Sequence, residues 1–173
     1  MNFTPKNLAF ADMIRGKLQG QHFMNFIGFE LTKIEAGLVE GHMPIIESIK
    51  QQTGFVHGGA TATFADLVMG FAAYSLVDVD QVVFTADLRI SYLNPGIGQQ
   101  VWAKGWVIKP GQNLIFCEAE IWTKSWESGV GNLESHNPLS PALANQILIA
   151  KASSTIAVVN LSGLGTRFTS DQD

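Results

Sequence analysis

The sequence predicts an α+β domain in which one long central helix is wrapped by an antiparallel sheet of five or six strands. Residues 54–77 are apolar on nearly every face at helical spacing, which indicates a buried helix. Three strand-like runs follow, over residues 82–93, 99–108 and 114–124, and a last one covers residues 146–160. Segments rich in Pro, Gly and Asn separate the first three runs, and such short turns favour antiparallel neighbours.

Length and composition indicate one domain that associates with itself. The chain has 173 residues, which suits a single domain over residues 1–173. Its net charge of −4 argues against a nucleic-acid binder, because neutralising phosphates requires a basic surface. Charged residues make up 15% of the chain, against about 25% in typical domains. We therefore expect part of the surface to be buried by self-association as a dimer or tetramer.

Cysteine content and the N-terminal residues favour a cytoplasmic protein. Cys117 is the single cysteine, so the chain forms no internal disulfide and no zinc ribbon. It lies on the apolar face of its strand, which predicts a buried thiol. The first 21 residues include Asp12, Arg15 and Lys17 and contain no apolar run, so no secretory signal is predicted.

The N-terminal third predicts a helix followed by a hairpin. Apolar residues recur at helical spacing over residues 7–19, and Gly20 is a suitable stop. Residues 29–36 and 38–46 alternate as two strands joined at Gly37.

The central helix over residues 54–77 is predicted to lie in the core and not in a membrane. Its length of about 20 residues would allow it to cross a bilayer. Asp66 lies in its middle, however, and a carboxylate at the centre of a span costs about 2.5–3.5 kcal/mol. The segment is also rich in Ala, Gly and Thr, with strands on both sides. We expect no membrane partner.

The run over residues 82–93 has the regular alternation of a half-buried strand. Its polar face carries Thr85, Asp87, Arg89 and Ser91, and its apolar face carries Phe84, Ala86, Leu88, Ile90 and Tyr92. Further on, residues 125–145 predict a polar loop, and residues 161–173 predict a frayed tail. The core is therefore expected over about residues 29–160.

Asp66 is the first candidate functional residue. It is the only acidic residue between Glu47 and Asp78, and it lies in the most apolar helix of the chain. Such a carboxylate is either a hydrogen-bonded structural group, a side chain on a solvent-exposed turn, or a catalytic group. Carboxylates in clefts are enriched at active sites, which favours a functional role.

The second candidate is the start of the same helix, at His57, Gly58 and Gly59. The first N–H groups of a helix have no intrahelical acceptor and lie at its positive end, so they suit an anion or oxyanion. The same sequence also suits an ordinary helix start. Gly58 and Asp66 are eight residues, or about 12 Å, apart along the helix, too far to act on one carbonyl within one chain. Either the two features are unrelated, or two subunits share a site.

These residues resemble the hotdog-fold acyl-CoA thioesterases of the phenylacetate-degradation (PaaI-like) type and the related hydroxybenzoyl-CoA thioesterases. The resemblance is carried by residues 51–59 (QQTGFVHGG), Asp66, Gly70, residues 83–88 and residues 94–96. It covers most of the chain and implies a hotdog fold, hydrolysis of acyl-CoA, and assembly as a dimer or tetramer. It implies no metal and no cofactor beyond the coenzyme A of the substrate.

The resemblance also implies roles for individual residues. The N–H of Gly58 would polarise the thioester carbonyl, and Asp66 of the partner subunit would act as general base or nucleophile. Gln51 corresponds to the family's Asn or Gln near the carbonyl and the attacking water, and Thr85 corresponds to a small hydroxyl that positions water.

His57 and Gly59 are expected beside the substrate, with His57 acting chiefly as a hydrogen-bonding residue. No basic cluster indicates where the phosphates of coenzyme A would bind. The long segment over residues 125–145 replaces a short turn of the family, and three roles stay open for it: a cap on the substrate channel, a surface insertion, or an oligomer contact.

Two other functions remain as alternatives. One is a non-catalytic acyl-CoA-binding or lipid-binding hotdog protein in which Asp66 serves folding. The other is a hotdog hydratase or dehydratase, but the Asp and His pair of those enzymes has no match in the sequence. The joint presence of Gln51, Gly58, Asp66 and Thr85 favours the hydrolase.

Overall fold

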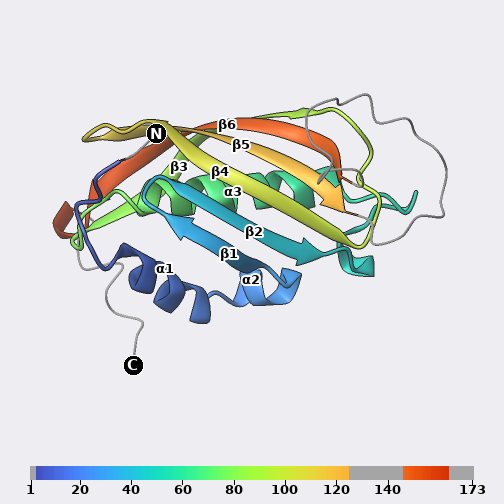
Figure 1. Ribbon diagram of the computed structural model, residues 1–173, viewed down its shortest axis with the longest axis horizontal. Helices are drawn as coiled ribbons and strands as arrows, with labels where there is room; N and C mark the ends of the chain where they lie inside the picture. The colour runs from blue at the N-terminus through green and yellow to red at the C-terminus, as the bar shows by residue number, and fades with distance from the viewer. Residues whose placement is uncertain (1–2, 125–145, 164–173) are drawn as a thin grey trace.

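The fold is a six-stranded antiparallel sheet that curves over one long helix, α3 (Gly58–Tyr74) (Figure 1). The computed structural model describes residues 3–124 and 146–163. Neighbouring strands follow the order β1-β2-β4-β5-β6-β3, and every pair is antiparallel. The α+β architecture that the sequence predicts is confirmed, with six strands.

The observed elements lie close to their predicted positions. The strands are β1 (Glu30–Glu35), β2 (Leu38–Pro44), β3 (Gln81–Tyr92), β4 (Gln100–Lys109), β5 (Leu114–Lys124) and β6 (Gln146–Asn160). Besides α3, the helical elements in residues 3–124 and 146–163 are α1 (Phe10–Gln19), α2 (His22–Ile27) and the short 3-10 helices η1 (Glu47–Ile49) and η3 (Leu161–Gly163).

The helices differ from the sequence prediction at several points. α1 begins three residues later than predicted, and α3 ends at Tyr74 and not at residue 77. After Gly20 the chain forms α2, a six-residue helix that buries Met24 and Ile27 and is too short to show a clear period. α3 begins at residue 58 and not at residue 54, because Gly54 adopts a φ of 82° and residues 51–54 form a turn instead.

α3 is buried because β4 and its neighbours approach its backbone closely. Phe64, Val68 and Met69 have no exposed surface. A Cβ atom added at Gly105 of β4 would lie 2.5 Å from the carbonyl carbon of Val68. Only glycine permits this approach, so the sheet can wrap tightly around the helix.

β3 departs from the alternation that the sequence predicts. Its register with β6 shifts between Thr85 and Asp87, so the strand has a bulge at that point. Thr85 therefore points towards α3, on the same side as Leu88, which packs against the core, while Phe84 is 50% exposed. The prediction that Phe84 shares a face with Leu88, and Thr85 with Asp87, is wrong, because one extra residue inverts the alternation.

Cys117 of β5 is a free, buried thiol, as the sequence predicts. Burial raises the pKa of this thiol to about 12. It therefore stays protonated near neutral pH, and a protonated thiol is a poor nucleophile.

Two predicted segments fall wholly or largely outside the part of the chain that the structure describes: the loop over residues 125–145 and residues 164–173 of the predicted tail. The first three tail residues form η3 and are not frayed. Within the described ranges, no helix has both the length and the hydropathy needed to cross a bilayer.

The close approach of α3 and β4 gives a stability prediction. We expect Gly105→Ala to lower the free energy of unfolding by about 1–3 kcal/mol, because the new Cβ would push the backbone of Val68 away. Gly16→Ala in α1 is the control, since a Cβ there meets nothing within 4 Å. Urea unfolding of both variants checks this, and a Gly105→Ala protein as stable as the control would contradict the tight packing.

Candidate active site

The N-terminus of α3 is capped by the side chain of His57. The backbone of His57 is extended, and its Nδ1 accepts a hydrogen bond of 2.9 Å from the N–H of Gly59. Its carbonyl oxygen accepts a second bond of 3.1 Å from the N–H of Thr61. The ring therefore satisfies one of the helix's otherwise unpaired donors.

The N–H of Gly58 has no acceptor among the described residues, whereas that of Gly59 is occupied by His57. The carbonyl of Gly58 accepts a hydrogen bond of 2.9 Å from the hydroxyl of Tyr92, at the end of β3. A Cβ at Gly58 would lie 3.3 Å from the Tyr92 ring, so glycine suits this contact. The helix terminus thus presents one N–H group at its positive end.

Gln51 lies in the turn that leads into α3. Its N–H donates to the carbonyl of Phe55 at 2.9 Å, and its carbonyl accepts from the N–H of Gly54 at 2.8 Å. The bridge between Lys50 and Val56 closes the base of this turn. Gln51 therefore lies at the N-terminal end of α3, the same end as Gly58.

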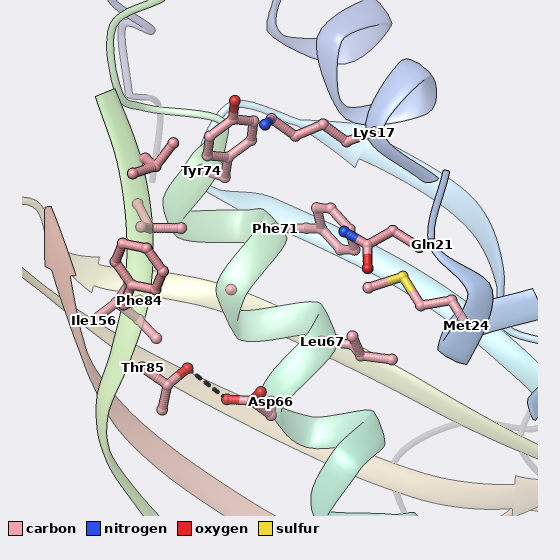
Figure 2. A pocket seen from close by; sticks show the side chains of 13 residues that line it. Lys17, Gln21, Met24, Asp66, Leu67, Phe71, Tyr74, Phe84, Thr85 and Ile156 are labelled. Atoms are coloured by element: carbon pink, nitrogen blue, oxygen red, sulfur yellow. Dashed lines mark hydrogen bonds between the residues drawn. The ribbon is translucent and has the colours of Figure 1, made fainter. Parts of the chain in front are cut away.

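Asp66 lies two turns further along α3, where its carboxylate meets β3. The hydroxyl of Thr85 donates a hydrogen bond of 2.6 Å to Oδ1 of Asp66 (Figure 2). A bond this short is typical of a hydroxyl that donates to a charged carboxylate. Oδ2 has no donor among the described residues, so it is available to a water molecule or substrate.

Both residues line a pocket beside α3, with a volume of about 510 Å³. This lies within the range of about 300–1,000 Å³ that is common for ligand sites. Leu67 and Phe71 of α3 and Phe84 of β3 give it apolar walls (Figure 2). Lys17 of α1 lies at the far end, with its ammonium 5.1 Å from the centre of the Tyr74 ring.

The predicted site residues form two groups that one chain does not bring together. Gln51, His57, Gly58 and Gly59 lie at the N-terminal end of α3, and Asp66 and Thr85 lie at its middle. The rise between Gly58 and Asp66 is about 12 Å. Among the described residues, no group of His, Cys, Asp and Glu side chains is arranged to hold a metal ion.

Sequence reasoning did not single out Tyr92, Lys17 or Gln21 for the site. Tyr92 contacts Gly58 from a strand that lies far along the chain. Lys17 reaches the pocket from α1, and Gln21 reaches it from the connection between α1 and α2. No local pattern identifies such residues, because their role arises from tertiary packing alone.

The capping role of His57 predicts a specific pair of stability changes. We expect His57→Ala to lower the free energy of unfolding by about 1 kcal/mol, because the N–H of Gly59 loses its acceptor. His57→Asn should restore the stability, since Asn is among the best capping residues. If urea unfolding shows both variants to be equally destabilised, the ring stabilises the protein by something other than capping.

Comparison with known sequences identifies the relatives of this chain. Residues 53–128 match the Thioesterase superfamily. The chain is 32% identical over 69 residues to the proofreading thioesterase EntH of Klebsiella pneumoniae, a match that covers 40% of this chain and half of EntH. It is 24% identical over 125 residues to human acyl-coenzyme A thioesterase 13, which covers 70% of this chain and 88% of that protein.

Solved structures with the same fold align with this chain over nearly all of their own length. A thioesterase family protein from Silicibacter pomeroyi aligns with a TM-score of 0.75 at 25% identity, over 87% of this chain and 98% of its own. The E. coli PaaI protein, from the phenylacetic acid degradation operon, aligns over 87% of this chain and 94% of its own. Its TM-score of 0.69 at 14% identity shows a shared fold. Residues 53–128 therefore resemble the thioesterase superfamily, and the chain has the hotdog fold that these solved structures share.

Proposed function

We propose that this protein hydrolyses acyl-CoA thioesters to a free acid and coenzyme A, in a site that two copies of the chain share. The observation that carries the proposal is the carboxylate of Asp66, held by Thr85 at the wall of a largely apolar pocket. The match of residues 53–128 to the Thioesterase superfamily and the match to acyl-coenzyme A thioesterase 13 support the same substrate class.

The N–H of Gly58 is proposed to stabilise the charge that develops during hydrolysis. Attack on a thioester places negative charge on the carbonyl oxygen. A fixed donor at the positive end of a helix binds that oxygen more strongly in the transition state than in the ground state. Gly58 provides such a donor, since its N–H has no acceptor among the described residues.

Asp66 is proposed to act in thioester hydrolysis by one of two routes. As general base it takes a proton from water, whose oxygen bonds to the carbonyl carbon while the C–S bond breaks and the thiolate of coenzyme A takes up a proton. As nucleophile it attacks the carbon itself, releases the thiolate and leaves a mixed anhydride that water cleaves. In both routes Thr85 orients the carboxylate, and Gln51 is assigned to the carbonyl and the attacking water.

A shared site follows from the distance between the two groups. Because about 12 Å separates Gly58 from Asp66 along one helix, the Gly58 that acts with Asp66 is assigned to a second copy of the chain. β3 provides the contact: it is an edge strand of 12 residues, and no described strand pairs with its outer side. Tyr92 and Leu93 are 55% and 49% exposed. Long apolar edges are normally covered, and antiparallel pairing of β3 with its copy gives a closed two-fold dimer.

The proposed chemistry requires no metal and no cofactor beyond the coenzyme A of the substrate. His57 and Gly59 then form the helix cap that presents Gly58 to the thioester. The single, buried cysteine supports a cytoplasmic location, because a chain with one cysteine has no internal disulfide that an oxidising compartment would be needed to form.

The role of Asp66 gives the first functional prediction. We expect Asp66→Asn to lower thiol release by about 10²–10⁴-fold, because the amide neither accepts a proton nor attacks the carbonyl. The measurement is thiol release from short, medium, long and aryl acyl-CoAs, with Asp80→Asn as an exposed acidic control.

Each outcome of that measurement separates two functions. Near-normal turnover by Asp66→Asn would remove the catalytic assignment. If the wild-type protein binds acyl-CoA but releases no thiol from any member of the panel, the protein is a non-catalytic binder.

The shared site predicts that two inactive variants restore each other. Gly58→Pro removes the N–H and keeps the helix, since proline suits the first helical position and His57 already has the extended backbone that precedes proline. It also adds a Cβ 3.3 Å from the Tyr92 ring. We expect it to lower turnover by about 10²–10³-fold. Equal amounts of Gly58→Pro and Asp66→Asn, refolded together, should recover about a quarter of wild-type activity, because half the dimers carry one intact site of two.

The controls for this mixing experiment are each variant refolded alone and the two variants mixed without refolding. Urea unfolding of Gly58→Pro shows whether the tight contact with Tyr92 is kept. Recovery of no activity by the refolded mixture of stable variants would place both groups in one chain and contradict the shared site.

A further inference from the structure

Gly70 occupies the interior of α3, where glycine is an unfavourable choice. It lies four residues after Asp66 and four before Tyr74, the last residue of the helix. Glycine in a helix interior destabilises the helix relative to alanine, because it loses more backbone freedom on folding. A structural reason is therefore required for its presence at this position.

The usual reasons for glycine do not apply to Gly70. Gly28 and Gly37 adopt positive φ angles, whereas Gly70 does not. Gly105 allows a close backbone approach, but a Cβ at Gly70 would meet nothing within 4 Å. The space in front of Gly70 is open.

That open space is part of the pocket next to Asp66. Gly70 lines the pocket and follows Asp66 by one turn on the same helical face, about 6 Å along the axis. The α3 residues that line the pocket run from Asp66 to Tyr74, and none precedes Asp66. The pocket thus extends from the carboxylate in one direction only, past Gly70.

We propose that Gly70 determines which acyl groups the protein accepts. This inference rests on the proposed thioesterase function. With the thioester at Asp66, the acyl group extends along α3 across Gly70 towards Phe71 and Tyr74. The missing side chain keeps this passage open, so the site takes medium-length aliphatic or aryl acyl groups. A side chain at position 70 would restrict the site to short ones.

The test compares Gly70→Ala and Gly70→Leu with Gly16→Leu, a helix glycine outside the pocket whose Cβ position is also open. Thiol release is measured with acetyl-CoA, butanoyl-CoA, octanoyl-CoA and phenylacetyl-CoA. We expect Gly70→Leu to lower kcat/KM for octanoyl-CoA and phenylacetyl-CoA by at least about 10-fold while acetyl-CoA changes little. Gly70→Ala should have a smaller effect, and Gly16→Leu none.

Two measurements distinguish a specificity role from a packing role. The urea midpoint of Gly70→Ala should equal or exceed that of the wild type, because alanine favours the helix and meets no neighbour. Equilibrium sedimentation should show the same oligomeric state for Gly70→Leu and the wild type. A lower midpoint, or loss of self-association, would assign the open space to packing or to the second copy and overturn the inference.

The remaining outcomes separate this inference from the proposed function. In two cases the inference about Gly70 is wrong although the proposed thioesterase function is supported. In the first, the wild type hydrolyses acyl-CoA but Gly70→Leu slows hydrolysis of all four substrates equally. In the second, the wild type hydrolyses acetyl-CoA alone. If the wild type hydrolyses no acyl-CoA, the proposed function and this inference both fail.

Discussion

Burial of α3 is the constraint on which the rest of the structure depends. A helix that is apolar on nearly every face needs cover on nearly every face, and a curved antiparallel sheet supplies it. The close approach at Gly105 allows the sheet to follow the helix surface. One stripe of α3 stays half-buried, and it carries Thr63, Asp66 and Gly70. The only carboxylate of the helix thus lies where the sheet leaves it open, beside a pocket, so its charge is not forced into the core.

The bulge in β3 connects this fold to its chemistry. It turns Thr85 towards α3, where the hydroxyl holds the carboxylate of Asp66 in one orientation. Tyr92 then ties the far end of the same strand to Gly58. β3 therefore contacts both groups of the candidate site, and it is also the edge on which a second copy would complete that site.

Much of this could be predicted from the sequence, because the signals were local. The regular patterns of apolar residues placed all six strands and α1 within three residues of their observed ends. The isolated carboxylate and the paired glycines pointed to the two groups of the candidate site. α2 was missed, because six residues show no clear period. The faces of β3 were assigned wrongly across part of the strand, since one extra residue reverses an alternation without leaving a mark in the sequence.

The sequence by itself determined the fold class and the apolar central helix, and it made Gly58 and Asp66 candidates for the site, because helical and strand periods and turn residues are encoded over short stretches. The tertiary structure alone decided that Thr85 donates a hydrogen bond to Asp66, that Tyr92 donates one to Gly58, and that the space at Gly70 stays open. Each of these facts depends on residues from different elements meeting in space, and the distance between two side chains is set by how the sheet packs on the helix.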